Sequence, residues 1–115
     1  MKTLNKIFLI GNVGNTPDIK ILNNDIKVAR FSLATSETHK NKEGVKNTET
    51  QWHQVLAWNS IAAVVEKYIH KGATLHVTGK IQYRQYTDEN EQTHYVTEII
   101  AEEIIMLDKP PPQNT

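Results

Sequence analysis

Hydrophobic and polar residues alternate along most of this chain, which is the pattern of strands that bury one face of a sheet. Residues 27–35 show it best, because Ala29, Phe31 and Leu33 fall on one side and Arg30 on the other. Residues 18–22 and 27–35 flank a turn-forming Asn-Asn-Asp and predict a hairpin. Further strands are expected at residues 6–13, 51–58, 73–86 and 94–107.

One segment, residues 59–72, has helical spacing instead. Its apolar stripe predicts an amphipathic helix with Asn59 or Ser60 as the N-cap and Gly72 as the C-terminal stop. The stripe consists of Ile61, Val64, Val65, Tyr68 and Ile69.

Three polar segments predict connections. Residues 37–50 predict a long exposed loop, and residues 87–93 predict a hairpin turn. Residues 108–115 predict a short disordered tail after a single domain at residues 1–107. The order is strand, hairpin, strand, helix, hairpin, with about five antiparallel strands. This order predicts an all-β OB-fold, a five-stranded Greek-key barrel with one α-helix between strands 3 and 4.

Composition narrows the class of protein. The 115 residues contain no cysteine, which excludes disulfides, thiolate metal sites and cysteine nucleophiles. No apolar run approaches the roughly 20 residues of a membrane-spanning helix, and an intracellular protein is expected. The net charge is zero, but residues 1–86 hold 12 Lys/Arg against 6 Asp/Glu, whereas residues 87–115 hold one against 7. Such segregation is a hint of contact with a polyanion.

The strand at residues 51–58 carries both tryptophans, and its faces differ. One face carries Trp52, Gln54, Leu56 and Trp58, and the other carries His53, Val55 and Ala57. Two interpretations remain open on spacing alone. The indoles either fill a core or form an exposed platform on which nucleotide bases stack.

Catalytic and metal-binding constellations are not found. The five histidines lack metal-ligand spacing, and no phosphate-binding loop or activated nucleophile is present. Glu102 and Glu103 fall on opposite faces of a strand, so they form no acid/base pair. We therefore expect no enzyme activity, no metal and no cofactor.

Aromatic residues interleaved with cations remain. His39 lies near Lys42 in the predicted loop, and Tyr86 follows Arg84 near the predicted hairpin turn. This combination favours binding of single strands without sequence preference. Tyr83 and Tyr95 are assigned to ordinary sheet packing.

Several motifs in order resemble the bacterial single-stranded DNA-binding protein (SSB) family. They are NKIFLIGNVG near the start, FSLATSE at 31–37, WHQVLAWNSIAAVVEKYIHKG at 52–72 and YVTE at 95–98. The resemblance covers about residues 5–107. It implies an OB-fold, a homotetramer, and a cytoplasmic, nucleoid-associated protein that coats single-stranded DNA in DNA replication, recombination and repair.

The resemblance also implies roles for individual residues. DNA-stacking aromatics of the family match His39, Trp52, Trp58 and Tyr86, of which His39 departs most from the usual residue type. Family positions that contact phosphates match Lys6, Lys42, Lys71 and Arg84. His53 matches a histidine near a subunit interface.

The end of the chain departs from the family pattern. Relatives usually continue into a linker and an acidic tip that recruits replication and repair enzymes, whereas this sequence stops at PPPQNT. Recruitment through such a tip is therefore not expected. The alternatives are a primosome-type OB-fold adaptor, dimeric and weak in binding single-stranded DNA, and a small enzyme.

Overall fold

The computed structural model describes residues 2–108, and its strands follow the alternating segments of the sequence. The predicted tail lies outside the described residues, apart from Asp108. Within them, one helix follows the fourth strand, and a short 3-10 turn, η1 (Asn23–Asp25), joins the second strand to the third. The elements are β1 (Ile7–Val13), β2 (Asp18–Ile21), β3 (Lys27–Lys40), β4 (Lys46–Trp58), α1 (Asn59–Tyr68), β5 (Thr74–Thr87) and β6 (Thr93–Met106).

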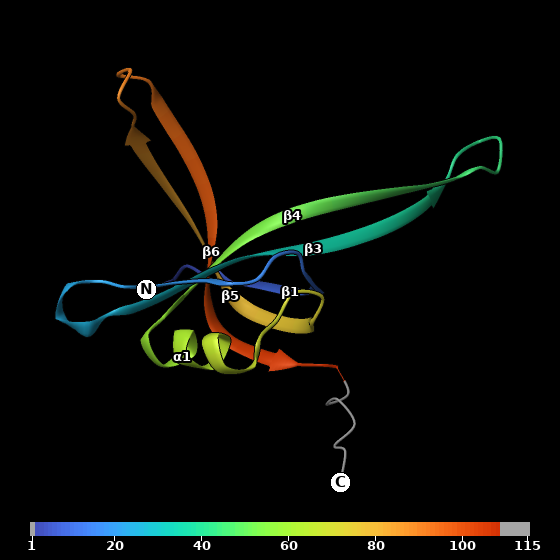
Figure 1. Ribbon diagram of the computed structural model, residues 1–115. Helices are drawn as coiled ribbons and strands as arrows, with labels where there is room; N and C mark the ends of the chain where they lie inside the picture. Colours follow the sequence, from blue (N-terminus) through green and yellow to red (C-terminus); the bar gives the residue numbers. More distant parts are fainter. Residues whose placement is uncertain (1, 109–115) are drawn as a thin grey trace, which may run out of the picture.

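Five of the described strands close into a barrel. Their order is β1-β5-β6-β4-β3, and β3 pairs with β1 to complete the ring. β2 is a sixth, short strand that extends the sheet beyond β3. In chain order, α1 therefore lies between the third and fourth barrel strands. This confirms the predicted OB-fold (Figure 1).

The expectation of a purely antiparallel barrel was wrong at one pairing. β4 and β6 run parallel, with Val55 opposite Ile99 and Leu56 opposite Ile100. A ring of five strands has an odd number of pairings, so strand direction cannot alternate all the way round. At least one parallel pair is therefore unavoidable.

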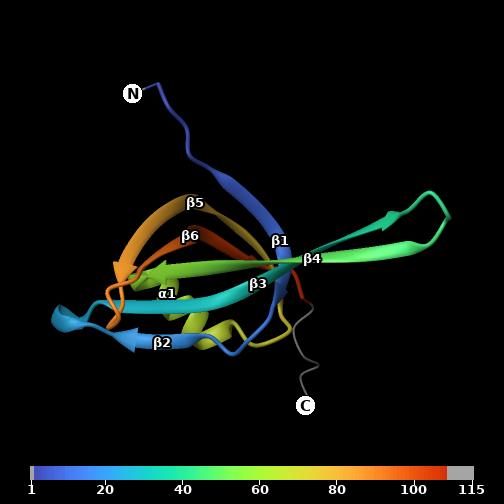
Figure 2. The ribbon, with the colours of Figure 1, turned by 90° about the horizontal axis from the view of Figure 1, so that it is seen from above.

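The predicted loop at residues 37–50 was also wrong, because most of it is strand. β3 and β4 remain paired as far as Lys40 opposite Lys46, and they form a ribbon that projects from the barrel (Figures 1 and 2). The turn is confined to residues 41–45, where the Asn41 side chain accepts the N–H groups of Glu43 and Val45. Both faces of this ribbon are exposed, so its sequence has no apolar alternation to predict a strand.

β5 and β6 form a second projecting ribbon (Figure 1). Its turn follows Thr87 and ends before Thr93, as predicted. At the barrel end of β5 a bulge lies between Thr78 and Gly79. Gly79 permits this close approach, because a Cβ there would collide with the backbone carbonyl of Ile100.

Helix α1 is shorter than predicted. It ends at Tyr68, and Ile69 has extended backbone angles. The expected side-chain cap was wrong, since Trp58 occupies the N-cap position without a capping hydrogen bond. Gly72 lies beyond the helix at φ 92°, where its N–H donates to the carbonyl of Val13 and directs the chain into β5.

The core fills the barrel between its strands and α1. The helix contributes Ala62 and Val65, which are fully buried. Fully burying a side chain as large as valine contributes about 1.5–3 kcal/mol, so the core fixes the barrel wall from which both ribbons extend. The largest apolar side chains that are fully buried are Phe31, Leu33, Leu75, Val55, Val65 and Val77.

Candidate nucleic-acid interface

β4 presents both tryptophans outside the core, which decides between the two interpretations of its sequence. The relative exposure is 60% for Trp52 and 39% for Trp58, whereas Val55 and Ala57 on the other face are buried. Gln54 lies between the indoles and donates to the Ser32 hydroxyl at 3.1 Å. The indoles are therefore available on one side of the barrel wall.

The backbone of Gly14 supports Trp52. A Cβ at Gly14 would collide with the six-membered part of the indole. The absence of a side chain thus lets the ring lie directly against the chain that follows β1. This contact restrains the edge of the six-membered ring of Trp52, which reduces the conformational entropy that the side chain has left to lose when a ligand stacks on it.

Arg84 and Tyr86 lie on the same face of β5, as strand alternation requires. The guanidinium carbon of Arg84 is 5.8 Å from the centroid of the Tyr86 ring, within the range of a cation–π contact. Tyr86 also stacks on His94 of β6, with ring centroids 4.9 Å apart and an angle of 19° between the planes. One flat side of the Tyr86 ring therefore packs on protein, while the residue remains 46% exposed.

Asp88 fixes His94 in turn. Its carboxylate lies 2.7 Å from Nε2 of His94 and accepts the backbone N–H groups of Asn90 and Gln92. The hydrogen bond with His94, followed by those from the turn, lowers the pKa of Asp88 below its ordinary value of 3.8. The tip of the β5–β6 ribbon is thus tied to the ring that supports Tyr86.

Glu98 is a residue of this site that sequence reasoning missed. It is 1% exposed, and its Oε1 accepts a hydrogen bond from Nε of Arg84 at 2.6 Å. Arg30 of β3 approaches the other carboxylate oxygen at 3.4 Å. The hydrogen bond to Glu98, together with that carboxylate's charge, raises the pKa of Arg84 above its ordinary value. One signal in the sequence pointed towards this contact. Strand alternation places Arg30 on the face of β3 that is turned away from the core.

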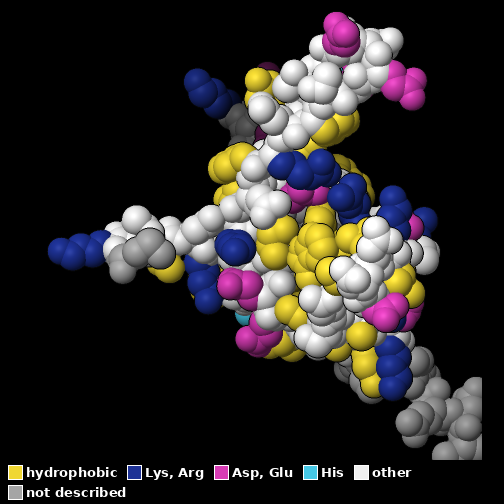
Figure 3. Space-filling model, turned by 90° about the vertical axis from the view of Figure 1, so that its left-hand side faces the viewer, with side chains coloured by type: hydrophobic (Ala, Val, Ile, Leu, Met, Phe, Trp, Pro, Cys, Tyr) yellow, Lys and Arg dark blue, Asp and Glu magenta, His cyan; other side chains and the backbone are white. Residues whose placement is uncertain are grey.

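These cations border an apolar surface. A groove of about 300 Å³ is lined by Trp58, Leu56 and Val28 together with Arg30 and Arg84. Figure 3 shows the side of the molecule from which the β2–β3 turn projects, with hydrophobic side chains in its middle and Lys or Arg side chains beside them. Stacking surface and positive charge therefore occur together here.

Other predicted contacts lie away from this groove. His39 and Lys42 are at the far end of the β3–β4 ribbon, and the register places His39 on the ladder face opposite to Trp52. Nε2 of His39 is 3.5 Å from Glu37, whose face also carries Glu49. Lys6 precedes β1 and Lys71 follows α1; both are exposed, and neither lines the groove.

His53 lies on the opposite face of β4 from the tryptophans. It is partly buried, and its Nε2 is 2.9 Å from the Thr35 hydroxyl. Its place at a subunit interface stays a prediction.

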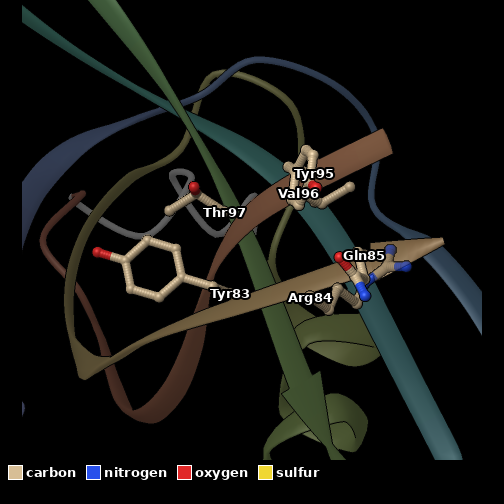
Figure 4. A pocket seen from close by; sticks show the side chains of 6 residues that line it. All are labelled: Tyr83, Arg84, Gln85, Tyr95, Val96 and Thr97. Carbon is tan, nitrogen blue, oxygen red and sulfur yellow. The ribbon is translucent and has the colours of Figure 1, made fainter. Parts of the chain in front are cut away.

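The assignment of Tyr83 and Tyr95 to ordinary sheet packing was wrong. Their relative exposures are 75% and 80%. With Gln85, Val96, Thr97 and the stem of Arg84 they line a shallow pocket of about 320 Å³ on the β5–β6 ribbon (Figure 4). Alternation places both rings on the face away from Tyr86.

Residues 2–108 contain no cluster of His, Cys, Asp or Glu that could hold a metal ion. In the same residues, we find no helix long and apolar enough to cross a membrane.

Comparison with known proteins identifies relatives of the whole domain. The model of the single-strand binding protein family matches residues 4–107. A single-stranded DNA-binding protein of Xylella fastidiosa (strain Temecula1) is 38% identical over 104 residues, which are 90% of this chain and 63% of the relative. One from Bacteroides thetaiotaomicron is 40% identical and is covered to 66% of its length. The chain thus spans about two thirds or less of these curated relatives.

Solved structures agree with the fold. The Plasmodium falciparum SSB in complex with single-stranded DNA has a TM-score of 0.86 and 40% identity, with 94% of this chain and 98% of that chain covered. A deletion mutant of the Thermus aquaticus single-stranded DNA-binding protein has a TM-score of 0.78 and 25% identity, with 91% of this chain and 51% of that one covered. The match over residues 4–107 and the shared barrel show that this chain belongs to the single-strand binding protein family.

Proposed function

We propose that this protein binds single-stranded DNA without sequence preference and coats it during replication, recombination and repair. The observation that carries the proposal is the exposure of Trp52 and Trp58 on one face of β4, with Trp58 beside the arginines of the groove. Membership of the family supports it, as does the likeness to an SSB solved with single-stranded DNA.

Binding would combine stacking with neutralisation of phosphates. Bases would stack on Trp52, Trp58 and Tyr86, and each stack is worth about 1–3 kcal/mol. Every base has a flat π-face, so this mode does not read sequence. Arg84 would contact the backbone next to Tyr86. More distant contacts at His39, Lys6, Lys42 and Lys71 require the strand to follow the surface from the groove towards the β3–β4 ribbon and the barrel ends.

We also propose that the protein assembles as a homotetramer. The outer face of the β1–β5–β6 sheet carries an apolar cluster in which Phe8 and Ile10 are 65% and 63% exposed. His76 is paired with Ile10 and with Ile105, and its ring stacks near that of Phe8. A contiguous apolar surface of this kind is typical of a protein–protein contact. In this proposal His53 lies near a second contact between subunits.

Titration of tryptophan fluorescence with oligo-dT tests the DNA-binding proposal. Only two tryptophans are present, and both belong to the proposed surface. We expect strong quenching in low salt, similar midpoints with mixed-sequence oligonucleotides of equal length, and much weaker binding of a blunt duplex. Unchanged fluorescence and no mobility shift with any single strand would overturn the proposal.

Light scattering tests the assembly separately. We expect a mass four times that of the 13.1 kDa chain, and Phe8→Asp should reduce it. A monomer at micromolar concentration would contradict the tetramer but would leave the DNA-binding proposal standing.

A further inference from the structure

The groove beside Trp58 contains an arginine that was not among the expected DNA contacts. Arg30 lies opposite Leu56 in the β3–β4 register, and Trp58 is therefore its diagonal neighbour. Diagonal neighbours in a sheet are within reach of long side chains. Arg30 and Trp58 line the same groove, so a ligand on the indole would meet this guanidinium.

Two guanidinium groups converge here because one carboxylate holds both. Glu98 accepts from Nε of Arg84 at 2.6 Å and from its Nη2 at 3.4 Å, and Nη2 of Arg30 is 3.4 Å from the same carboxylate. Two adjacent cations would otherwise repel each other. With Glu98 buried beneath them, they can remain close while their outer parts face solvent.

Within residues 2–108, most hydrogen-bond donors of this arginine pair make no contact with protein acceptors. A guanidinium has five N–H groups in a fixed fork, so the two arginines have ten. Glu98 accepts from only a minority of these ten N–H groups. The side chains of Arg30 and Arg84 are 47% and 37% exposed. An anion with several acceptor oxygens in different directions, such as a phosphodiester, fits these remaining donors.

We infer that Arg30 and Arg84, paired on Glu98, form a subsite for one backbone phosphate of the nucleotide whose base lies on Trp58. This inference rests on the proposed function and adds Arg30 as a binding residue, with Glu98 as the residue that positions both arginines. The groove volume of about 300 Å³ is at the lower end of small-ligand sites, which suits a single nucleotide.

The charges around this subsite nearly cancel, so it can bind a phosphate only through direct contact. Lys20 lines the groove from β2, and Asp18 lies opposite Arg30 across the β2–β3 pair. Counting Arg30, Arg84, Lys20, Asp18 and Glu98 gives three cations and two carboxylates, a surplus of one positive charge. Since the net field is small, hydrogen-bond geometry at the two guanidiniums has to supply the binding.

The salt dependence of oligo-dT binding by Arg30→Gln tests this inference. Each phosphate neutralised on a single strand contributes about 0.7 to the slope of log K against log salt. Arg30→Gln should therefore reduce the slope by about 0.7. The matched control is Lys27→Gln on the same strand, because Lys27 faces the other way and pairs with Glu66 of α1 at 2.6 Å. Its slope should equal that of the native chain.

A second variant separates charge from geometry. Arg30→Lys keeps the charge but loses the fork, so we expect a nearly native slope with weaker binding. Thermal unfolding of each variant reports whether the barrel is intact; Arg84 still pairs with Glu98 in both Arg30 variants. An Arg30→Gln slope equal to that of Lys27→Gln, with native quenching, would overturn the subsite and leave the proposed function intact. If the native chain did not bind oligo-dT, both the subsite and the proposed function would be overturned.

Discussion

The two ribbons that project from the barrel have the same backbone architecture but different side-chain support. From Ser36 to Gln51 every residue of the β3–β4 ribbon is exposed, and its cross-strand contacts include the hydroxyl pairs Ser36–Thr50 and Thr38–Thr48. The β5–β6 ribbon instead carries a continuous chain of contacts. It runs from buried Glu98 through Arg84, Tyr86 and His94 to Asp88 at the turn.

The two ribbons can therefore take part in binding in different ways. A ring that already packs on a neighbour has less conformational entropy to lose when a base stacks on it. Tyr86 is such a ring. His39, near the end of the other ribbon, lies 3.5 Å from the exposed carboxylate of Glu37, and within residues 2–108 it stacks on no other ring. We expect the β5–β6 ribbon to be a preformed part of the surface and the β3–β4 ribbon to become ordered on binding.

Removing the buried carboxylate of Glu98 should destabilise the protein much more than removing a side chain from the β3–β4 ribbon. Hydrogen bonds to charged groups contribute about 1.5–3 kcal/mol each, so Glu98→Ala should lower the free energy of unfolding by at least that amount. Thr50→Ala on the other ribbon should change it by no more than about 0.5 kcal/mol. Urea unfolding of both variants provides the measurement. Equal losses would mean that the two ribbons are supported alike.

The same contrast explains which parts of the structure were predictable. Core-facing alternation in residues 27–35 and 51–58 predicted the barrel part of β3 and β4, because one face of each is buried. Beyond Thr35 that signal ends, since a two-sided polar ribbon has no buried face to impose a period. Lysines, threonines and Gly44 there suggested a loop, whereas pairing with the neighbouring strand made a ribbon.

The sequence predicted the aromatic residues of the candidate site, but not the contacts that hold them in place. Trp52, Trp58, Tyr86 and Arg84 could be selected as residue types at suitable positions. The contacts of Arg30 with Glu98 and of His94 with Asp88 depend on which strands become neighbours. Arg30 and Glu98 are 68 positions apart in the sequence and come from β3 and β6, so local spacing could not indicate that they meet.

Replacing one aromatic residue on each ribbon should weaken DNA binding to different extents. Tyr86→Ala should raise the dissociation constant for oligo-dT about 5- to 150-fold, which corresponds to the 1–3 kcal/mol of one stack. His39→Ala should raise it less than about fivefold, because Glu37 and Glu49 share its ladder face. Tyr86→Phe is the control, since it keeps the ring. Fluorescence titration at constant salt gives all three values, and a larger effect at His39 would contradict a preformed β5–β6 surface.

The smallest expected effect concerns acid stability at the β5–β6 turn. The pKa of Asp88 is lowered in the folded protein, so its ionised form stabilises the fold above the ordinary carboxyl pKa. That contribution is lost as the pH falls through this value towards the lower folded pKa. Asp88→Asn keeps an oxygen for the turn N–H groups but has no charge. It should be less stable than the native chain at pH 6, and the difference should narrow between pH 5 and pH 3.

Glu37→Gln, beside His39 on the other ribbon, is the matched control and should change the free energy of unfolding at pH 6 by no more than about 0.5 kcal/mol. Urea unfolding at each pH measures the differences, and a constant gap for Asp88→Asn from pH 6 to pH 3 would show that the Asp88 charge does not support the turn.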